Sequence, residues 1–327
     1  MKLTITELTQ TTTETWLDFW QHCPWATVPE SPDWFNLWVS CLDTNARTYP
    51  LLVTFSDGVQ CVIPALRVGR VRNLVEVLQA GPSGGYGGPL SRDVLTGSHL
   101  TLILDRIRRE HADFHLRINP FLLHRIQPVL NSITCTILPT PVRADFTQPV
   151  PLDNHIEDLL SRKRVRRYAR SASANGFQVK VMPAEEIDEY IQTYTEAKVR
   201  WKEATVDYPD RFFKAMANLT DCTFFGVYDD EGNYCGGGPI LTGGTIVTTW
   251  LSVMRNNRLK SHIYELFYYE LVHRFRSEGY AWFDFNPSSG KAGVIRFKRN
   301  FTPYTLPAPE YEGYSWKRLA LIALGRP

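Results

Sequence analysis

The sequence predicts a mixed α/β fold in two domains, each with a central mixed sheet flanked by helices. The chain has 327 residues, more than one domain usually contains, and 43% of them are apolar, which is enough for two cores. Helical and strand periodicities alternate along the chain. The second half repeats the order of elements found in the first. We therefore expect domains at 1–150 and 151–327.

The elements of the first half follow from apolar spacing and from turn residues. We expect helices at 16–20, 34–42 and 98–110, and strands at 49–55, 59–66, 74–79 and 114–118. A glycine-rich loop occupies 81–88. The last strand ends in Asn119-Pro120.

The second half has the same plan. We expect helices at 185–202 and 261–278, and strands at 223–228, 234–241, 245–253 and 280–285. The helix at 261–278 has apolar residues four positions apart and is followed by Gly279, a residue that commonly ends helices. Those apolar residues are Ile263, Phe267, Leu271 and Phe275.

Small signatures indicate that one half duplicates the other. The turns Asp57-Gly58 and Glu231-Gly232 each precede a cysteine by three residues. The last strand of each half also ends in Asn-Pro, at Asn119-Pro120 and at Asn286-Pro287. The alternative is two unrelated halves with similar turn chemistry, because turns converge on these residues.

Composition excludes several classes of protein. Lys and Arg number 36 against 34 Asp and Glu, a net charge of +2 that excludes a histone-like or acidic-tail protein. The six cysteines show no CxxC pair, so we expect reduced thiols in a cytoplasmic protein. The N-terminus lacks a signal-peptide pattern. The uncharged stretch 232–254 is interrupted by glycines, so it predicts strands and a turn and no transmembrane segment.

A dense run of positive charge lies between the two halves. We expect a connecting helix at 159–175 that begins near Ser161, ends at Asn175-Gly176 and carries Arg162, Lys163, Arg164, Arg166, Arg167 and Arg170. Like charges destabilise a helix, so one interpretation is an anionic ligand: a phosphate-bearing substrate, an RNA backbone or an acidic carrier protein. The other is a solvated helix whose arginines pair with Asp or Glu of the domains. Both stay open.

Several well-known motifs are missing. The chain has no GxxxxGK[ST] loop, no GxGxxG before a helix and no GxSxG turn. His111 and His115 are four positions apart, but a change from helix to strand falls between them, so they predict no metal site. We expect neither a bound metal nor a DNA partner.

The most informative segment is 280–298. Alternation places three side chains on one face of a strand, near the carboxyl end where open sheets bind ligands: Trp282, Asp284 and Asn286. Ser288 or Ser289 can cap the helix that follows, whose first N–H groups favour an anion. That helix ends at 296–298 with two cations beside an aromatic ring.

Three segments resemble Fem-like transferases, which are tandem proteins of the acetyltransferase (GNAT) fold. FDFN at 283–286, a small-residue turn and RFKRNF at 296–301 are similar to their C-terminal signature. The loop 86–90 (YGGPL) resembles one in the first Fem domain, and 160–181 resembles the basic connection to the second. The resemblance covers nearly the whole chain, most tightly 159–301, and implies two tandem GNAT-like domains.

The resemblance implies an enzyme, an amide-forming N-acyltransferase. The implied donor is aminoacyl-tRNA or an acyl thioester on CoA or on a carrier protein, which acts as a co-substrate, so no tightly bound cofactor is expected. The implied acceptor is a primary amine of a peptide, an amino acid or a peptidoglycan precursor. The alternative is a non-catalytic RNA- or carrier-protein-binding module with a degenerate GNAT fold.

Candidate roles can be assigned on this basis. Lys298 matches the family's Phe-Lys position, where it would stabilise a phosphate or the developing oxyanion. Asp284 would orient or deprotonate the amine, with a structural salt bridge as the alternative, and Tyr264 is a candidate proton donor. The expected substrate-binding residues are Phe297, Asn286, Ser288, Tyr86, Gly87, Trp250 and Arg296. The expected carrier- or phosphate-binding residues are Arg164, Arg167, Arg255 and Arg258.

Two positions depart from the family pattern. The turn 255–260 contains no glycine, where simple acetyltransferases cradle the CoA pyrophosphate, and Asn286 stands where the family more often has glycine. The C-terminal segment 315–324, with Trp316 beside Lys317 and Arg318, is expected to dock on its own domain. Contact with a membrane or a partner is the alternative for this segment.

Overall fold

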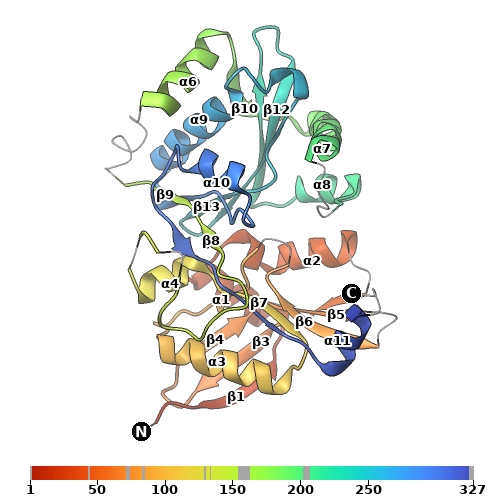
Figure 1. Ribbon diagram of the computed structural model, residues 1–327, viewed down its shortest axis with the longest axis vertical. Coiled ribbons are helices and arrows are strands. Elements are labelled where there is room, and N and C mark those ends of the chain that lie inside the picture. The colour runs from red at the N-terminus through yellow and green to blue at the C-terminus, as the bar shows by residue number, and fades with distance from the viewer. Residues whose placement is uncertain are drawn as a thin grey trace. The chain divides into compact units, whose positions relative to one another are not determined.

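The structure is a computed structural model that describes residues 2–42, 45–70, 74–82, 85–128, 130–132, 134–153, 163–201 and 207–323. Contacts divide the chain into two units. The first comprises Met1–Thr147, Pro287–Ser289 and Thr305–Pro327, and the second Gln148–Asn286 and Gly290–Tyr304. Each unit has its own sheet and helices (Figure 1), which confirms the predicted mixed α/β fold.

The first unit contains two larger sheets. One has the order β1-β3-β4, from β1 (Ile5–Gln10), β3 (Leu51–Phe55) and β4 (Gln60–Ile63). The other has the order β17-β7-β6-β5-β2, from β17 (Glu310–Gly313), β7 (Phe114–Arg117), β6 (Val75–Ala80), β5 (Leu66–Arg70) and β2 (Ala46–Thr48). A short pair joins β8 (Phe146–Thr147) to β16 (Leu306–Pro307). Only β6 and β7 are parallel among these paired strands, and the helix α3 connects them.

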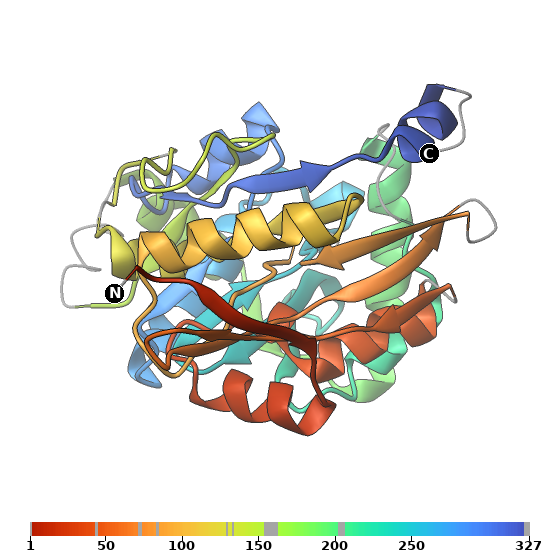
Figure 2. The ribbon, with the colours of Figure 1, turned by 90° about the horizontal axis from the view of Figure 1, so that it is seen from below.

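The helices of the first unit pack on these strands. They are α1 (Thr13–His22), α2 (Pro32–Cys41), α3 (Gly97–Glu110), α4 (Pro120–Ile126) and α11 (Trp316–Ala323), with a 3₁₀ turn at Val28–Glu30. Figure 2 shows α3, in yellow, and α1 and α2, in red, on opposite sides of the strands. Asn119, which the sequence places at a strand end, caps α4 by accepting hydrogen bonds from the Phe121 and Leu122 main chain.

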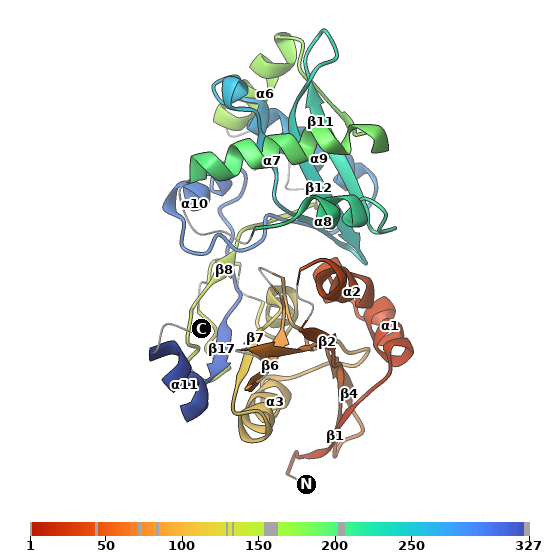
Figure 3. The same ribbon diagram turned by 90° about the vertical axis from the view of Figure 1, so that its right-hand side faces the viewer.

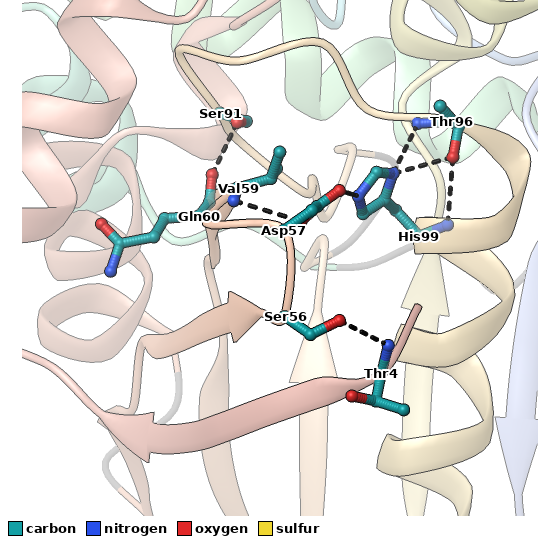
Figure 4. A network of polar contacts seen from close by, with 8 residues as sticks. All are labelled: Thr4, Ser56, Asp57, Val59, Gln60, Ser91, Thr96 and His99. Carbon is teal, nitrogen blue, oxygen red and sulfur yellow. Dashed lines mark hydrogen bonds and ion pairs between the residues drawn. The ribbon is translucent and has the colours of Figure 1, made fainter. Parts of the chain in front are cut away.

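A buried histidine links the predicted turn at Asp57-Gly58 to helix α3 (Figure 4). His99 Nδ1 accepts a hydrogen bond from the main-chain N–H of Thr96 at 3.1 Å, so its other ring nitrogen carries the proton. That Nε2–H donates to Asp57 Oδ2 at 3.1 Å. The network therefore fixes the start of α3 against the β3–β4 hairpin.

The end of the chain returns to the first unit, whereas the sequence-based boundaries assign 305–327 to the second domain. Strand β17 pairs antiparallel with β7, with Glu310 opposite Arg117. Their side chains form a buried ion pair in which Asp145 also takes part. The reason for the difference is that strand pairing joins residues far apart in sequence, which local periodicity does not reveal.

The second unit has one sheet of order β10-β11-β12-β13-β15-β9, and β14 pairs β12 beside this path. The strands are β10 (Gln178–Val181), β11 (Cys222–Tyr228), β12 (Tyr234–Gly243), β13 (Ile246–Thr249), β14 (Val253–Met254), β15 (Trp282–Asp284) and β9 (Pro149–Pro151). Strands β13 and β15 are parallel and joined through helix α9, as β6 and β7 are through α3. This shared β-α-β order supports the predicted duplication.

Helices cover both faces of this sheet (Figures 1 and 3). One face carries α6 (Lys163–Ala174) and α9 (Ile263–Ser277), whose apolar sides form a common core with Phe283 and Phe285. The other carries α7 (Ile187–Trp201) and α8 (Asp210–Met216). Helix α10 (Ala292–Lys298) follows β15, and 3₁₀ turns lie at Ala184–Glu186 and Asn256–Arg258. The predicted apolar stripe on α9 is buried as expected.

Two strands that the sequence predicts as continuous are each divided in two. The stretch 59–66 becomes β4 and β5, which belong to different sheets, because Pro64 between them has no N–H to donate to a ladder. The stretch 245–253 becomes β13 and β14, because Leu251 adopts a φ of 46°, which interrupts a strand.

The structure also bears on the membrane and cysteine expectations. None of the helices in the described ranges combines the length and the apolar character that crossing a bilayer requires. The uncharged stretch 232–254 instead contributes β12, β13 and β14. All six cysteines are free thiols, and five of them are buried.

Candidate active site

The sheet of the second unit opens where β13 gives way to β14. Strand β13 pairs with β15 through residues 246–248, whereas β14 pairs with β12 at Gly236 and Gly237. Glycine is required there, because a Cβ on Gly236 would lie 2.6 Å from the Val253 carbonyl oxygen. The bend at Leu251 therefore carries β14 toward β12, and β13 and β15 part at their carboxyl ends.

Two tyrosines of α9 lie against this bend. The Tyr268 phenol lies near the side chains of Thr249 and Ser252, one on each side of Leu251, and these polar groups partly offset the effect of burial on its pKa. One helical turn earlier, the Tyr264 phenol is hydrogen bonded to the main chain of Met254 in β14. Burial raises the pKa of both phenols, so both stay protonated at neutral pH and can donate a hydrogen bond.

The end of β15 is held by side-chain hydrogen bonds. Asp284 is fully buried, and its Oδ1 accepts from the main-chain N–H of Asn286 at 3.1 Å. Asn286 Nδ2 donates to the Thr249 carbonyl at 2.9 Å, so a side-chain hydrogen bond takes the place of the ladder just beyond the last paired residues, Thr248 and Asp284. Asn286 has a φ of 60°, the left-handed conformation that glycine adopts most easily, which explains the family's preference for glycine here.

Lys298 contributes a buried positive charge at the same place. It lies at the end of α10, is 7% exposed, and its Nζ donates to the Asn286 carbonyl at 2.6 Å. The neighbouring Phe297 ring packs against Tyr264 and Tyr268, with centroids 5.9 and 5.8 Å apart. The predicted cation beside an aromatic ring is therefore present, and it lies inside the second unit.

These groups share a clear chemical character. A cation and two protonated phenols lie around the parting strands, and all of them stabilise negative charge. Burial strengthens such interactions because little water screens them. Within the described residues Asn286 Oδ1 has no hydrogen-bond partner, although it is buried. An N–H donor from a ligand would satisfy it.

The comparison with protein families assigns this part of the chain. Residues 161–299, which include the parting strands, α9 and Lys298, match the family model described as an acetyltransferase (GNAT) domain. This region therefore has the GNAT fold and is called the GNAT domain below.

Solved structures extend the likeness beyond the GNAT domain. FemX superposes with a TM-score of 0.68 at 13% identity, over 97% of this chain and 99% of that chain. The C-terminal domain of a putative lysylphosphatidylglycerol synthetase from Agrobacterium fabrum gives 0.59 at 10%, over 96% of each chain. L-PGS from Bacillus licheniformis gives 0.53 at 13%, over 91% of this chain and 97% of that chain. These likenesses confirm the Fem-like tandem GNAT fold. A comparison with curated protein sequences gives no significant match.

Some predicted site residues lie elsewhere. Trp250 packs on the α7–α8 face of the GNAT domain, against the rings of Tyr208 and Phe212 at 4.8 and 5.6 Å. Arg296 is exposed on α10, and Ser288 groups with the first unit. These three residues do not join the tyrosines around the parting strands.

Tyr86 and Gly87 belong to the first unit and have structural roles. The Tyr86 ring is fully buried, and a Cβ on Gly87 would lie 2.6 Å from the Ala80 main chain. Glu30, also fully buried, accepts hydrogen bonds from the Gly88 main chain at 2.9 Å and from Asn119 at 2.7 Å. The loop is therefore packed into the core of this unit, which corrects the expectation that it contacts an acceptor.

The basic connecting helix is observed as α6, although 159–162 lie outside the described residues. Val165, Ala169 and Ala172 are buried against α9, which leaves four arginines exposed: Arg164, Arg166, Arg167 and Arg170. The Tyr168 ring stacks on His262, the residue before α9, at a centroid distance of 3.8 Å. Within the described part of the chain no ion pair involves these arginines.

The stack brings cations to the start of α9. The guanidinium carbons of Arg164 and Arg167 lie 5.5 and 5.0 Å from the Tyr168 ring centroid. Hydrogen bonds from both arginines lower the pKa of the Tyr168 phenol. These two predicted carrier-binding residues are therefore close to the start of α9.

The other two predicted phosphate contacts already have acidic partners. Arg255 forms an ion pair with Glu189 of α7, and Arg258 pairs with Asp229 at 2.9 Å. Their charge is balanced inside the domain, so they serve first to fix the glycine-free turn 255–260.

The sequence analysis missed the residues around the bend. Tyr268, Thr249 and Ser252 were not singled out, although Tyr264 and Tyr268 are one helical turn apart and therefore share a face of α9. That spacing was a usable signal. The contact of Tyr268 with Thr249 and Ser252 depends on the bend at Leu251, which no local pattern indicates.

One group among the described residues has the ligand types of a metal site: His115, Glu310 and Glu312 in the first unit. Arg117 and Arg143 both pair with Glu310, so its negative charge is already balanced. This arrangement suits an ion-pair network better than a cation.

Proposed function

We propose that the GNAT domain forms amides by transferring an activated acyl group to a primary amine. The observation that carries this proposal is the parting of β13 and β15 beside the buried Lys298 ammonium and the Tyr264 and Tyr268 phenols. The ladder between these two strands stops at Thr248 and Asp284, and we propose that the acyl donor lies beyond this point.

The reaction needs charge stabilisation at defined atoms. The amine nitrogen forms a bond to the acyl carbon, the bond from that carbon to the leaving group breaks, and the amine proton ends on the leaving group. The carbonyl oxygen becomes negative in between, and hydrogen-bond donors and a nearby cation lower that barrier. We assign Lys298 and Tyr268 to this electrostatic role.

Proton transfer is assigned to Tyr264. Its raised pKa keeps the phenol protonated at neutral pH, so it can protonate the leaving group, and the proton that the attacking amine loses then restores the phenol. Asn286 Oδ1 is the acceptor we assign to the amine N–H, because it is buried and without a partner in the described chain. Asp284 is fully buried and accepts the Asn286 N–H, so we assign it to positioning this turn.

The donor is proposed to be anionic and held by side chains. The turn 255–260 has no glycine to expose main-chain N–H groups to a pyrophosphate, whereas Arg164 and Arg167 lie close to the start of α9 through the Tyr168–His262 stack. Candidate donors are aminoacyl-tRNA and acyl thioesters of CoA or a carrier protein. Candidate acceptors are amines of peptides, amino acids or peptidoglycan precursors.

The decisive experiment incubates the protein with charged tRNAs and acyl thioesters and a panel of amines, and detects amide products by mass. We expect product with one donor class. Tyr264→Phe keeps the ring but removes the proton donor, so kcat should fall about a hundredfold. Tyr269→Phe is the matched control, since Tyr269 is also a partly buried tyrosine of α9 packed on the same core.

The outcomes separate the two functional readings. Equal activity of the two tyrosine variants would remove Tyr264 from the mechanism. Binding of tRNA or carrier protein without any amide product would favour the non-catalytic binding module. If both variants lose activity and also unfold, the same assay is carried out with Tyr264→Trp, and only folded protein is compared.

The donor-binding assignment has its own test. Replacing Arg164 and Arg167 by Gln should raise KM for the donor about tenfold and weaken its salt dependence, because two phosphate contacts are lost. The control replaces Arg108 and Arg109, which are exposed on α3 of the first unit, and removes the same charge. An equal effect in the control would point to net charge instead of a site on α6.

A further inference from the structure

The C-terminal helix α11 has an apolar face that no described residue of its own unit covers. None of its residues is buried, and Trp316, Leu319 and Ile322 are 74%, 53% and 42% exposed. This corrects the expectation that the segment docks on its own domain. Figure 2 shows α11, in dark blue, at the end of the chain beyond strand β17.

The helix is fixed only at its beginning. Ser315 donates its main-chain N–H to Asp113 at 2.9 Å, and its hydroxyl accepts from the Arg318 main chain at 3.2 Å, as a helix cap does. Strand β17, just before it, pairs with β7. The first turn of α11 is thus attached to the first unit, while the apolar side chains of the helix are exposed. A helix of 8 residues is marginal in water without a surface to pack on.

The spacing of the exposed residues defines a face. Trp316, Leu319, Ala320 and Ala323 stand at positions i, i+3, i+4 and i+7, which share one side of a helix, and all are exposed. Lys317 lies beside that face, whereas Arg318 lies on the other side of the helix, where its guanidinium donates to the Gly313 carbonyl at 3.4 Å. This arrangement is typical of helices that lie in a membrane interface.

The helix itself carries only positive charge. From residue 314 to the last residue the sequence contains Lys317, Arg318 and Arg326 and no Asp or Glu. The Arg318 guanidinium lies 4.5 Å from the Tyr314 ring centroid. The hydrogen bond with Glu312 raises the pKa of the Tyr314 phenol, and the nearby Arg318 and Arg143 partly offset this rise. The partner that complements this surface is anionic.

We propose that α11 is an interfacial anchor that binds this protein reversibly to membranes containing anionic lipids. The Trp316 and Leu319 side chains enter the boundary between headgroups and acyl chains. Lys317, beside this face, extends its ammonium group to lipid phosphates. Because the helix is attached through Ser315 at its beginning, this face can contact a flat surface.

A lipid surface fits the helix better than a second copy of the chain. Eight residues give a helix of about 12 Å. A stable protein interface needs about 800 Å² on each partner, far more than one face of so short a helix supplies. Interfacial binding to lipid needs only a few inserted side chains and complementary charge.

The test is vesicle flotation of the full-length protein. We expect binding to vesicles of 70% phosphatidylcholine and 30% phosphatidylglycerol, little binding to phosphatidylcholine alone, and weaker binding in high salt. Leu319→Glu should reduce bound protein at least tenfold, and Lys317→Glu with Arg318→Glu at least as much. Val94→Glu is the control, because Val94 is a distant apolar side chain of the same unit that is 82% exposed.

Three results would overturn the proposal. Absence of binding by the unchanged protein is one, and equal binding by Leu319→Glu and Val94→Glu is another. The third is a concentration-dependent dimer that Leu319→Glu abolishes while vesicle binding is absent, which would assign the face to a second copy. Leu319 is exposed, so loss of folding is not an expected cause, and circular dichroism of each variant checks this.

Discussion

The return of β17 to the first unit predicts that one buried carboxylate stabilises the fold far more than a similar exposed one. Glu310 pairs with Arg117 and Arg143, and its side chain is 3% exposed. Glu76, in the same sheet, also pairs with two arginines, Arg47 and Arg67, each at 2.8 Å, but is 43% exposed. The two sites differ mainly in burial, so Glu→Gln at each position isolates that difference.

The magnitude at Glu310 follows from its pKa. Burial by itself raises that pKa, but the hydrogen bond with His115 and the Arg117 guanidinium outweigh it and lower the pKa from 4.5 to about 2. This corresponds to about 3 kcal/mol of stability. It is fully present above pH 4.5, where the unfolded carboxyl is also ionised, and is lost as the pH falls through 2. Breaking a buried pair costs a similar 3–5 kcal/mol or so.

The assay is amide hydrogen exchange of peptides that cover β7 and β17, which reports the opening free energy of this sheet. At pH 7, Glu310→Gln should lower that free energy by about 3 kcal/mol, and Glu76→Gln by at most about 1 kcal/mol, the usual contribution of an exposed pair. The cost at Glu310 should shrink as the pH approaches 2. Equal costs at the two positions, or a cost at Glu310 that does not change with pH, would refute this reasoning.

Two further predictions concern the buried loop of the first unit. Gly87→Ala should lower the free energy of unfolding by at least about 2 kcal/mol, because the new Cβ would lie 2.6 Å from the Ala80 main chain. The control Gly58→Ala places its Cβ where no atom lies within 4 Å, so it should lower the free energy of unfolding by only about 1 kcal/mol, because of its φ of 89°. Thermal unfolding of the two variants measures the difference. Burial raises the pKa of Glu30 from 4.5 to about 7, so the folded state binds the proton more tightly and stability should fall by about 3 kcal/mol as the pH rises from 4.5 to above 7. Denaturation at several pH values measures this slope, and Glu30→Gln should flatten it; a slope that persists in that variant would assign it to other groups.

Several local features could be predicted because their signal lies within a few residues. Alternation placed Phe283 and Phe285 on the face opposite Trp282 and Asp284, and both are buried in the core. The four-residue spacing on α9 identified its buried side. Burial of Val165 and Ala169 turns the arginines of α6 outward, which the charge run alone suggested.

The candidate site was predictable only in part. Lys298, Phe297 and Tyr264 were identified through the family resemblance and lie together in the structure. Trp250 was expected to bind substrate, but a bend at Leu251 separates the end of β13 from β14, and the Trp250 ring packs on the α7–α8 face. Tyr86 was expected to bind substrate, because the sequence pattern of a tyrosine beside glycines is the same whether the tyrosine binds a ligand or fills a core.

The sequence by itself determined many of the helices and strands of this chain and which of their faces are apolar, because backbone periodicity and turn chemistry are local. It did not indicate β1, α4, α8 or β10. Only the tertiary structure decided that β17 joins β7, that 59–66 serves two sheets, and that β13 and β15 part beside Lys298. Those outcomes depend on which sheet edge offers unpaired main-chain groups and on which side chains collide, and both are set by residues far away in the sequence.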